Sequence, residues 1–216
     1  MARITVLGGT GYAGAAIAAE AAKRGHEVTA VSRTRPDDPI DGVQYVTGSV
    51  QDAAVLDAVV PGRDVVISAL SPRGDMAGKV EDVLRDLARR LDGTPARLAH
   101  VGGASSLLVE EGGPTLWEVT KEHVPDEVKP EIVTGLTILE DLQATPETLD
   151  WFFISPPEKF GSWEPAPATG SYRLGGDVLL RDDAGESLIS AADLAVAIVD
   201  EIETPAHRRR RFTAAH

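Results

Sequence analysis

The stretch Ile4–Gly14, ITVLGGTGYAG, decides the fold of this chain. Its first four residues are apolar or β-branched and predict a short buried strand, and Ala15–Ala22 follow with strong helix formers. The glycines at 8, 11 and 14 therefore stand at a turn from strand to helix, the context that makes a glycine-rich motif specific for dinucleotide binding. A glycine-rich turn that binds nothing is the alternative, and this context disfavours it.

Each glycine of the motif has a physical role in that interpretation. Gly8 allows the tight turn, Gly11 lets the backbone approach a pyrophosphate, and Gly14 lets the helix pack closely. The free N–H groups and the positive dipole end of the helix then face the phosphates.

Apolar runs of strand length alternate with helical patterns along the chain, which is typical of a parallel sheet covered by helices on both faces. We therefore expect an α/β Rossmann-type doubly wound parallel sheet with strand order 3-2-1-4-5-6. The predicted strands are Ile4–Gly8, Glu27–Ser32, Val43–Thr47, Asp64–Ala69, Arg97–Val101 and Trp151–Ser155. The predicted helices are Gly11–Arg24, Asp52–Val60, Lys79–Leu91, Pro130–Ala144 and Ala191–Glu203, with Ser190 as the N-cap of the last.

Two segments interrupt this alternation. Gly102–Lys129 is much longer than an ordinary connection, which indicates a function or an inserted helical turn. Phe160–Ile189 is rich in glycine and proline, and we expect residues 172–174 and 178–180 to form a hairpin around Gly175–Asp177. Because both segments follow strands on the ligand side, they should form a substrate lid. The chain is thus expected to be one domain, 1–216, with 156–190 as a small C-terminal substrate lobe inserted on the substrate side.

Composition narrows the class of protein. The chain has 216 residues, 43% of them hydrophobic, no cysteine and a formal net charge of −13. The lack of cysteine excludes disulfides and thiol catalysis and suits the cytoplasm. The negative charge argues against nucleic-acid partners, and no apolar run is long enough for a membrane span. The basic run Arg208–Arg211 is expected to be a solvated edge at a last short strand.

The end of the second predicted strand bears on the choice of cofactor. An acidic residue there would bind the ribose 2′-hydroxyl of NAD, whereas an arginine with small polar neighbours accommodates the 2′-phosphate of NADP. This chain has Ser32, Arg33 and Arg35 at that place. Arg33 can pair with a phosphate through two hydrogen bonds, so we expect NADP in preference to NAD.

The chain resembles the atypical short-chain dehydrogenase/reductases, specifically their small NAD(P)H-binding, NmrA-like group. Besides the glycine motif, the similar segments are residues 25–30, 42–50, 64–69, 101–104, 150–156 and 189–195. Within them Ser49 stands where the group usually has an aspartate. The resemblance covers essentially the whole chain.

The resemblance also implies which residues meet the cofactor. Gly11, Tyr12 and Ala13 would contact the pyrophosphate, Ser49 and Val50 would flank the adenine, and Ser155 and Pro156 would lie near the carboxamide. With the residues named from the motifs, the expected cofactor-binding set is Gly8, Thr10, Gly11, Tyr12, Ala13, Gly14, Ser32, Arg33, Arg35, Ser49, Val50, Ala69, Leu70, Ser71, Ser155 and Pro156. Tyr12 has the alternative of packing at the start of the helix.

The catalytic Tyr-x-x-x-Lys pair typical of these enzymes is absent from the sequence, because none of the three tyrosines is followed by a lysine at that spacing. Ser105 and Ser106 follow the fifth predicted strand and could donate a hydrogen bond to a substrate oxygen, or could cap a turn. His123 could relay a proton, although a solvated histidine is the simpler interpretation. His100 lies within a strand and is expected to be a core or edge residue. No residue spacing indicates a metal site.

The leading interpretation is an NADPH-dependent reductase of a flavin, a quinone-like ring or another conjugated small molecule, whose reduced form can take its proton from solvent. The alternative from another class is a non-catalytic NADP(H) sensor that binds a protein partner. An NAD-dependent epimerase or dehydratase ranks last, since such enzymes usually keep the tyrosine. A homodimer is compatible with all three.

Overall fold

The computed structural model describes the backbone of residues 1–216 and the side chains of residues 1–74 and 76–216. One eight-stranded sheet has the order β3-β2-β1-β4-β5-β6-β8-β7, so the predicted order of the first six strands is confirmed. Every neighbouring pair is parallel except β7 with β8. The strands are β1 (Arg3–Leu7), β2 (Glu27–Ser32), β3 (Val43–Thr47), β4 (Val65–Ser68), β5 (Arg97–Val101), β6 (Asp150–Ser155), β7 (Arg173–Gly175) and β8 (Arg210–Ala215).

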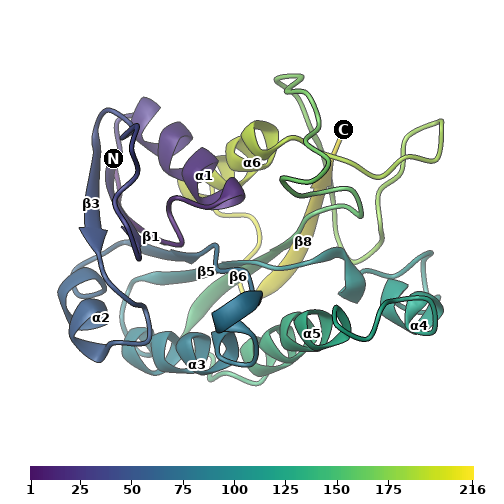
Figure 1. Cartoon of the computed structure of the whole chain (residues 1–216), viewed down its shortest axis with the longest axis horizontal. Helices are drawn as coiled ribbons and strands as arrows, with labels where there is room; N and C mark the ends of the chain where they lie inside the picture. The colour runs from purple at the N-terminus through teal and green to yellow at the C-terminus, as the bar shows by residue number, and fades with distance from the viewer.

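The helices cover both faces of the sheet (Figure 1). One face packs against α1 (Tyr12–Lys23) and α6 (Ala191–Glu203), and the other against α2 (Ala53–Val59), α3 (Val80–Leu91) and α5 (Lys129–Gln143). The shorter helices are η1 (Gly74–Met76), η2 (Ala104–Ser106) and α4 (Leu116–Thr120). None of the helices in the described part of the chain is long and apolar enough to cross a membrane.

The predicted helices and the first six strands agree with the structure to within one residue at each end. The α3 helix illustrates why: Val80, Val83, Leu84, Leu87 and Leu91 are all buried at helical spacing on one face. Ser190 caps α6 as predicted, since its hydroxyl accepts a hydrogen bond from the Asp193 amide at 2.9 Å. The long connection after β5 contains η2 and α4, so the expected inserted helical turn is confirmed.

The predicted hairpin around residues 175–177 is wrong. Residues Arg173–Gly175 form β7, but they pair with β8 in an antiparallel register, whereas Val178 bridges to Leu108. The local Gly-Gly-Asp signal allows a turn, but residues 173–175 instead pair with β8, a strand far along the chain.

The basic run Arg208–Arg211 leads into β8 as predicted, but its solvated interpretation is wrong for two of its members. Arg209 donates hydrogen bonds to the carbonyls of Thr145, Pro146 and Leu149, and thereby ties the segment after α5 to β8. The side chain of Arg211 is 8% exposed and pairs with Asp177.

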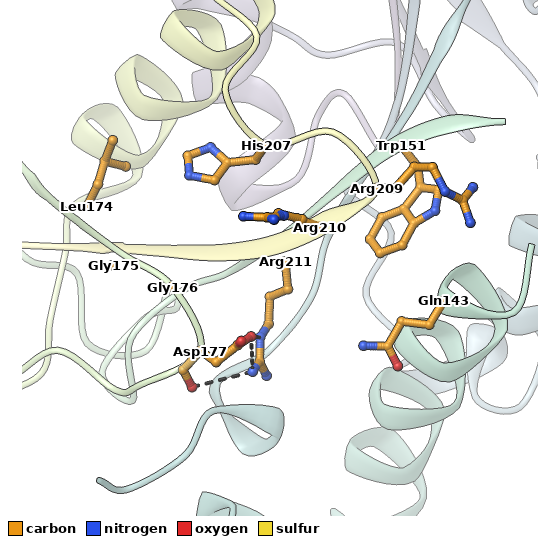
Figure 2. A pocket seen from close by; sticks show the side chains of 10 residues that line it. All are labelled: Gln143, Trp151, Leu174, Gly175, Gly176, Asp177, His207, Arg209, Arg210 and Arg211. Carbon is orange, nitrogen blue, oxygen red and sulfur yellow. Dashed lines mark hydrogen bonds and ion pairs between the residues drawn. The ribbon is translucent and has the colours of Figure 1, made fainter. Parts of the chain in front are cut away.

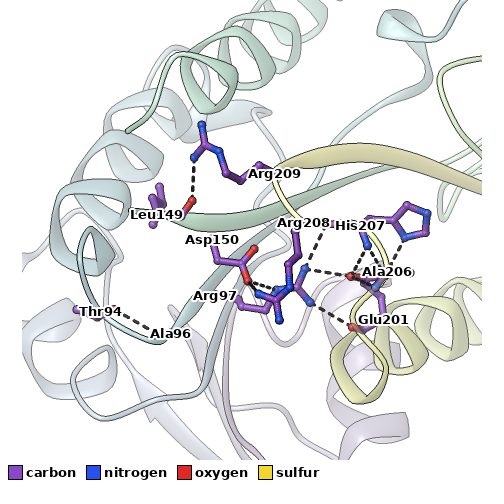
Figure 3. Close-up of polar contacts among 10 residues, drawn as sticks. All are labelled: Thr94, Ala96, Arg97, Leu149, Asp150, Glu201, Ala206, His207, Arg208 and Arg209. Atoms are coloured by element: carbon purple, nitrogen blue, oxygen red, sulfur yellow. Dashed lines mark hydrogen bonds and ion pairs between the residues drawn. The ribbon is translucent and has the colours of Figure 1, made fainter. Parts of the chain in front are cut away.

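A buried ion pair fixes the turn between α6 and β8 (Figure 3). Arg97 Nη2 on β5 lies 3.0 Å from Glu201 Oε1 on α6, and both residues are buried. The Glu201 carboxylate also accepts hydrogen bonds from the amides of Ala206 and His207 and from the His207 ring. Burial alone would raise the pKa of Glu201, but these donors outweigh it and hold the pKa below its ordinary value. The pair therefore anchors the entry to β8.

Candidate dinucleotide cavity

A cavity of about 780 Å³ opens at the carboxyl ends of the strands, where the strand order changes direction at β1 and β4. Its volume lies within the range of small-molecule sites, and its position is the one that open α/β sheets use for ligands. The predicted residues that line it are Gly8, Thr10, Gly11, Tyr12, Ala13, Ser32, Arg33, Ser49, Val50, Ala69, Leu70, Ser71, Ser105, Ser106 and Pro156.

The turn between β1 and α1 fits a pyrophosphate. Gly8 has φ +81°, a conformation that favours glycine, and a Cβ on Gly14 would lie 2.2 Å from the Gly8 carbonyl oxygen. Gly14 does not itself line the cavity; it allows α1 to begin directly against the turn. The N-cap of α1 is Gly11, which has no side chain to cap the first N–H groups, and the first turn holds no acidic residue. The start of α1 is thus available to an anion.

The end of β2 forms one side of the cavity. Arg33 lines it and is exposed, while the Ser32 hydroxyl donates a hydrogen bond to the Thr34 carbonyl at 2.7 Å and shapes the turn. Arg35 is exposed but lies outside the lining. Among the described lining residues the carboxylates are Glu131 and Glu158, which come from α5 and from the segment after β6, not from β2.

Hydroxyl groups gather where β5 and β6 end. Ser105 and Ser106 lie in η2 and line the cavity, and Ser106 Oγ is 3.5 Å from Ser155 Oγ. Ser155 is fully buried beneath the lining rather than in it. The Ser106 carbonyl accepts a hydrogen bond from Arg211, which fixes the loop that carries both serines.

Of the two histidines considered from sequence, His100 is the one that lines the cavity. His100 is 3% exposed but lines the cavity, and its Nδ1 has no hydrogen-bond partner among the described residues. Burial lowers the pKa of His100 to about 4, so its ring is neutral at pH 7. His123 is exposed and is not among the residues that line the cavity. We therefore assign His123 no part in the chemistry of the cavity.

Of the three tyrosines, all of which the structure describes, only Tyr12 lines the cavity. Its ring centroid lies 5.3 Å from that of Phe160, so it also packs against the segment after β6. The Tyr172 hydroxyl donates to Asp200 on α6, and burial with this hydrogen bond raises the pKa of Tyr172 to about 12. Within the described part of the chain, no group of three or more His, Asp or Glu side chains is arranged to hold a metal ion.

Several lining residues carried no sequence motif. The set comprises Arg73, Met76, His100, Leu116, Val128, Glu131, Ile132, Gly135, Leu136, Phe160, Gly161, Ser162 and Trp163. Several come from α5, which is apolar on two sides: Leu139 and Leu142 are buried in the core, Ile132 and Leu136 line the cavity, and the buried Ile138 belongs to both. Leu116 and residues 160–163 belong to the two segments expected to form a lid, and both segments reach the cavity.

A second cavity, of about 510 Å³, lies beside β7 and β8 (Figure 2). Its lining shares no residue with the first cavity. Its charged groups are largely engaged in holding the sheet edge, because Arg211 pairs with Asp177 and Arg209 binds backbone carbonyls. The first cavity, with its open helix start, is therefore the candidate site.

The sequence model of the NAD(P)H-binding family matches residues 8–205, which include the glycine turn and α6. The chain belongs to this NAD(P)H-binding family. Its architecture and this match place it among the atypical short-chain dehydrogenase/reductases.

Relatives of this NAD(P)H-binding protein span its whole length. The YwnB protein of Bacillus subtilis is 36% identical over 213 residues, 98% of this chain and 97% of YwnB. A candidate NADH-flavin reductase from Streptococcus pneumoniae has a similar structure, with a TM-score of 0.86, 30% identity and coverage of 100% of both chains. A candidate epimerase from Bacteroides thetaiotaomicron has a TM-score of 0.84 and 32% identity, covering 100% of this chain and 98% of its own.

Proposed function

We propose that this protein is an NADP(H)-dependent reductase whose acceptor is a flavin or another planar conjugated ring. The observation that carries the proposal is the division of the cavity: a helix start without a side-chain cap and Arg33 lie on one side, and hydroxyl groups without a tyrosine–lysine pair lie on the other. The likeness to a candidate NADH-flavin reductase supports the acceptor class.

The choice of NADP rests on the end of β2. Arg33 can hold the 2′-phosphate through two hydrogen bonds, and no described carboxylate from β2 lines the cavity to repel it. We expect NADP(H) to bind at least about tenfold more tightly than NAD(H), a difference of about 1.4 kcal/mol. Titration of both cofactors into wild type and Arg33→Ala tests this, since the variant should lose most of the preference while its affinity for NAD(H) stays unchanged. Equal affinities in the wild type would contradict the assignment.

The chain's own part in the chemistry is to bind, to orient and to polarise. The turn from Gly8 to Ala13 and Arg33 would hold the dinucleotide, whose reduced nicotinamide would supply the hydride for the acceptor, with the proton taken from solvent. The hydroxyl of Ser105 or Ser106 donates a hydrogen bond to the acceptor oxygen on which negative charge develops. His100, neutral and buried beside them, adds no charge to the site.

Oxidation of NADPH across a panel of flavins, quinones and aldehydes tests the reaction. We expect turnover with the flavins and quinones and little with aldehydes, because hydride transfer to an aldehyde carbon requires protonation of the carbonyl oxygen, and the sequence has no tyrosine–lysine pair to supply that proton. Tight binding of NADPH without turnover of any acceptor would contradict the proposal and favour a sensor that signals to a protein partner.

A further inference from the structure

Three segments meet at one part of the cavity lining: Arg73 after β4, Glu131 on α5 and Trp163 after β6. Arg73 Nε lies 2.8 Å and 2.7 Å from the two carboxylate oxygens of Glu131. The Arg73 guanidinium carbon also lies 4.5 Å from the centroid of the Trp163 ring, within the range of a cation–π contact. These contacts join parts of the chain that surround the cavity.

Trp163 is held in place while much of its surface remains open. It is 60% exposed, and it is the one large, strongly exposed apolar side chain that lines the cavity among the described residues. A Cβ on Gly161 would lie 2.1 Å from the indole ring, so a glycine at that position lets the ring fold back against its own backbone. An indole fixed in this way at a cavity can stack on a planar ring without first losing much side-chain entropy.

The positive charge of Arg73 next to the indole indicates that a stacked ligand would carry an anionic group. Arg73 and Arg33 are the arginines of the described lining, and Arg33 comes from another part of it, at the end of β2. The carboxylate of Glu131 engages the Arg73 guanidinium at Nε, whereas the other lining carboxylate, Glu158, lies 2.7 Å from Arg181. A phosphate or carboxylate of a ligand can offer Arg73 the same paired oxygens that Glu131 offers now.

We propose that Trp163 and Arg73 form an acceptor subsite that selects a planar conjugated ring bearing an anionic group, with flavin mononucleotide as the representative ligand. The ring stacks on the indole, and the phosphate replaces Glu131 as the partner of the Arg73 guanidinium. Glu131 thereby acts as an internal competitor that keeps Arg73 oriented between binding events. This inference rests on the proposed function, because it identifies the acceptor that the reductase would use.

Equilibrium binding of flavin mononucleotide and riboflavin tests the subsite without relying on turnover. Both share the ring, but only the first has the phosphate. Each is titrated by flavin fluorescence anisotropy with oxidised NADP present in saturating amount, so that the dinucleotide site is filled. We expect wild type to bind flavin mononucleotide at least fivefold more tightly than riboflavin, with the difference shrinking as salt increases.

The variants separate stacking from charge. Trp163→Ala should weaken the binding of both flavins about tenfold, because it removes the aromatic ring on which they stack, whereas Trp163→Phe should keep most of the affinity. Arg73→Gln should remove the preference for the phosphate, and it should weaken riboflavin much less than Trp163→Ala does. Glu131→Gln should strengthen the binding of flavin mononucleotide and leave that of riboflavin unchanged, because it removes the competing carboxylate. Arg89→Gln, an exposed change on α3 outside the lining, is the matched control and should change neither affinity.

Equal affinity for the two flavins in the wild type would overturn the inference, as would a Glu131→Gln variant that weakened flavin mononucleotide. If wild type binds NADPH but neither flavin, the acceptor subsite is refuted while the cofactor assignment stands. If it binds no NADPH, the proposed function itself fails. The wild-type comparison decides the question even where a variant is unstable by circular dichroism.

Discussion

Removal of the buried charge of Arg97 should destabilise the protein strongly. In Arg97→Met the side chain keeps its length over the Phe152 ring, which lies 4.8 Å from the guanidinium, but Glu201 loses its partner. Breaking a buried pair costs about 3–5 kcal/mol. Because Glu201 keeps the donors of Ala206 and His207, we expect the lower end, about 3 kcal/mol. For a chain of this length that is roughly 6–12 °C in Tm.

Urea unfolding of wild type, Arg97→Met, the double variant Arg97→Met/Glu201→Gln and Arg89→Met measures the change in the free energy of unfolding. The double variant Arg97→Met/Glu201→Gln should recover at least about 1 kcal/mol relative to the single variant, because an amide still accepts the backbone N–H groups but carries no charge. Arg89→Met breaks an exposed pair with Asp86 and should stay within about 0.5 kcal/mol of wild type. A loss below about 1 kcal/mol in Arg97→Met, or a double variant less stable than the single, would refute the reasoning.

Three further predictions concern the cavity. Gly11 has φ −77°, which any residue can adopt, and a Cβ there would lie 3.3 Å from the Gly8 carbonyl oxygen, so Gly11→Val should stay folded by circular dichroism. Its side chain would stand where the backbone approaches the pyrophosphate, so the variant should lose NADPH binding in titrations. Gly14→Ala should lower Tm, because its Cβ has no space. Tyr172→Phe should keep single-turnover NADPH oxidation within about tenfold, since its hydroxyl serves Asp200, while Ser106→Ala should slow it about 10²-fold. The pKa of His100 is lower in the folded state than in the unfolded state, so the unfolded state binds the proton first as pH falls. The free energy of unfolding should therefore decrease as pH drops from about 6.5 towards 4, by up to about 3 kcal/mol.

Each of these has an outcome that would contradict it. Normal NADPH affinity in folded Gly11→Val would move the phosphate site elsewhere. A thousandfold slower NADPH oxidation in Tyr172→Phe, together with a normal rate in Ser106→Ala, would identify the tyrosine as the proton donor. For His100 the matched comparison is His100→Leu, whose urea stability should depend less on pH than that of wild type; identical pH profiles would show that other groups account for the acid sensitivity.

The elements that could be predicted are those whose signal lies within a few neighbouring residues. The strand–glycine–helix turn and the apolar face of α3 need no partner to be recognised. The pairing of β7 could not be predicted in this way, because its partner strand β8 lies about forty residues downstream and meets it only through tertiary contacts. For the same reason Arg209 and Arg211 could not be seen as structural: their acceptors are brought close only by the finished sheet.

The candidate site divides along the same line. The turn between β1 and α1 comes from one contiguous motif, and every residue predicted from that motif except Gly14 lines the cavity. The acceptor side of the site is assembled from η2, α5 and the segment after β6, and no spacing in the sequence relates Arg73 to Glu131 or Trp163. The sequence did contain one signal for the acceptor side, namely apolar residues on two sides of α5. A helix that only covers a sheet needs a single apolar side.

The three-residue strand β7 has a consequence for how the molecule behaves among other copies of itself. Residues Phe212–Ala215 of β8 are buried and uncharged, and an open edge at such a strand would offer a row of amides and carbonyls to any passing chain. β7 occupies that row with a ladder of three residues, and its Arg173 folds back to donate to the carbonyls of His216 and Arg181. The edge that is left outward is a strand of three residues, which is too short to template another strand, so this border of the sheet resists intermolecular β-pairing and aggregation.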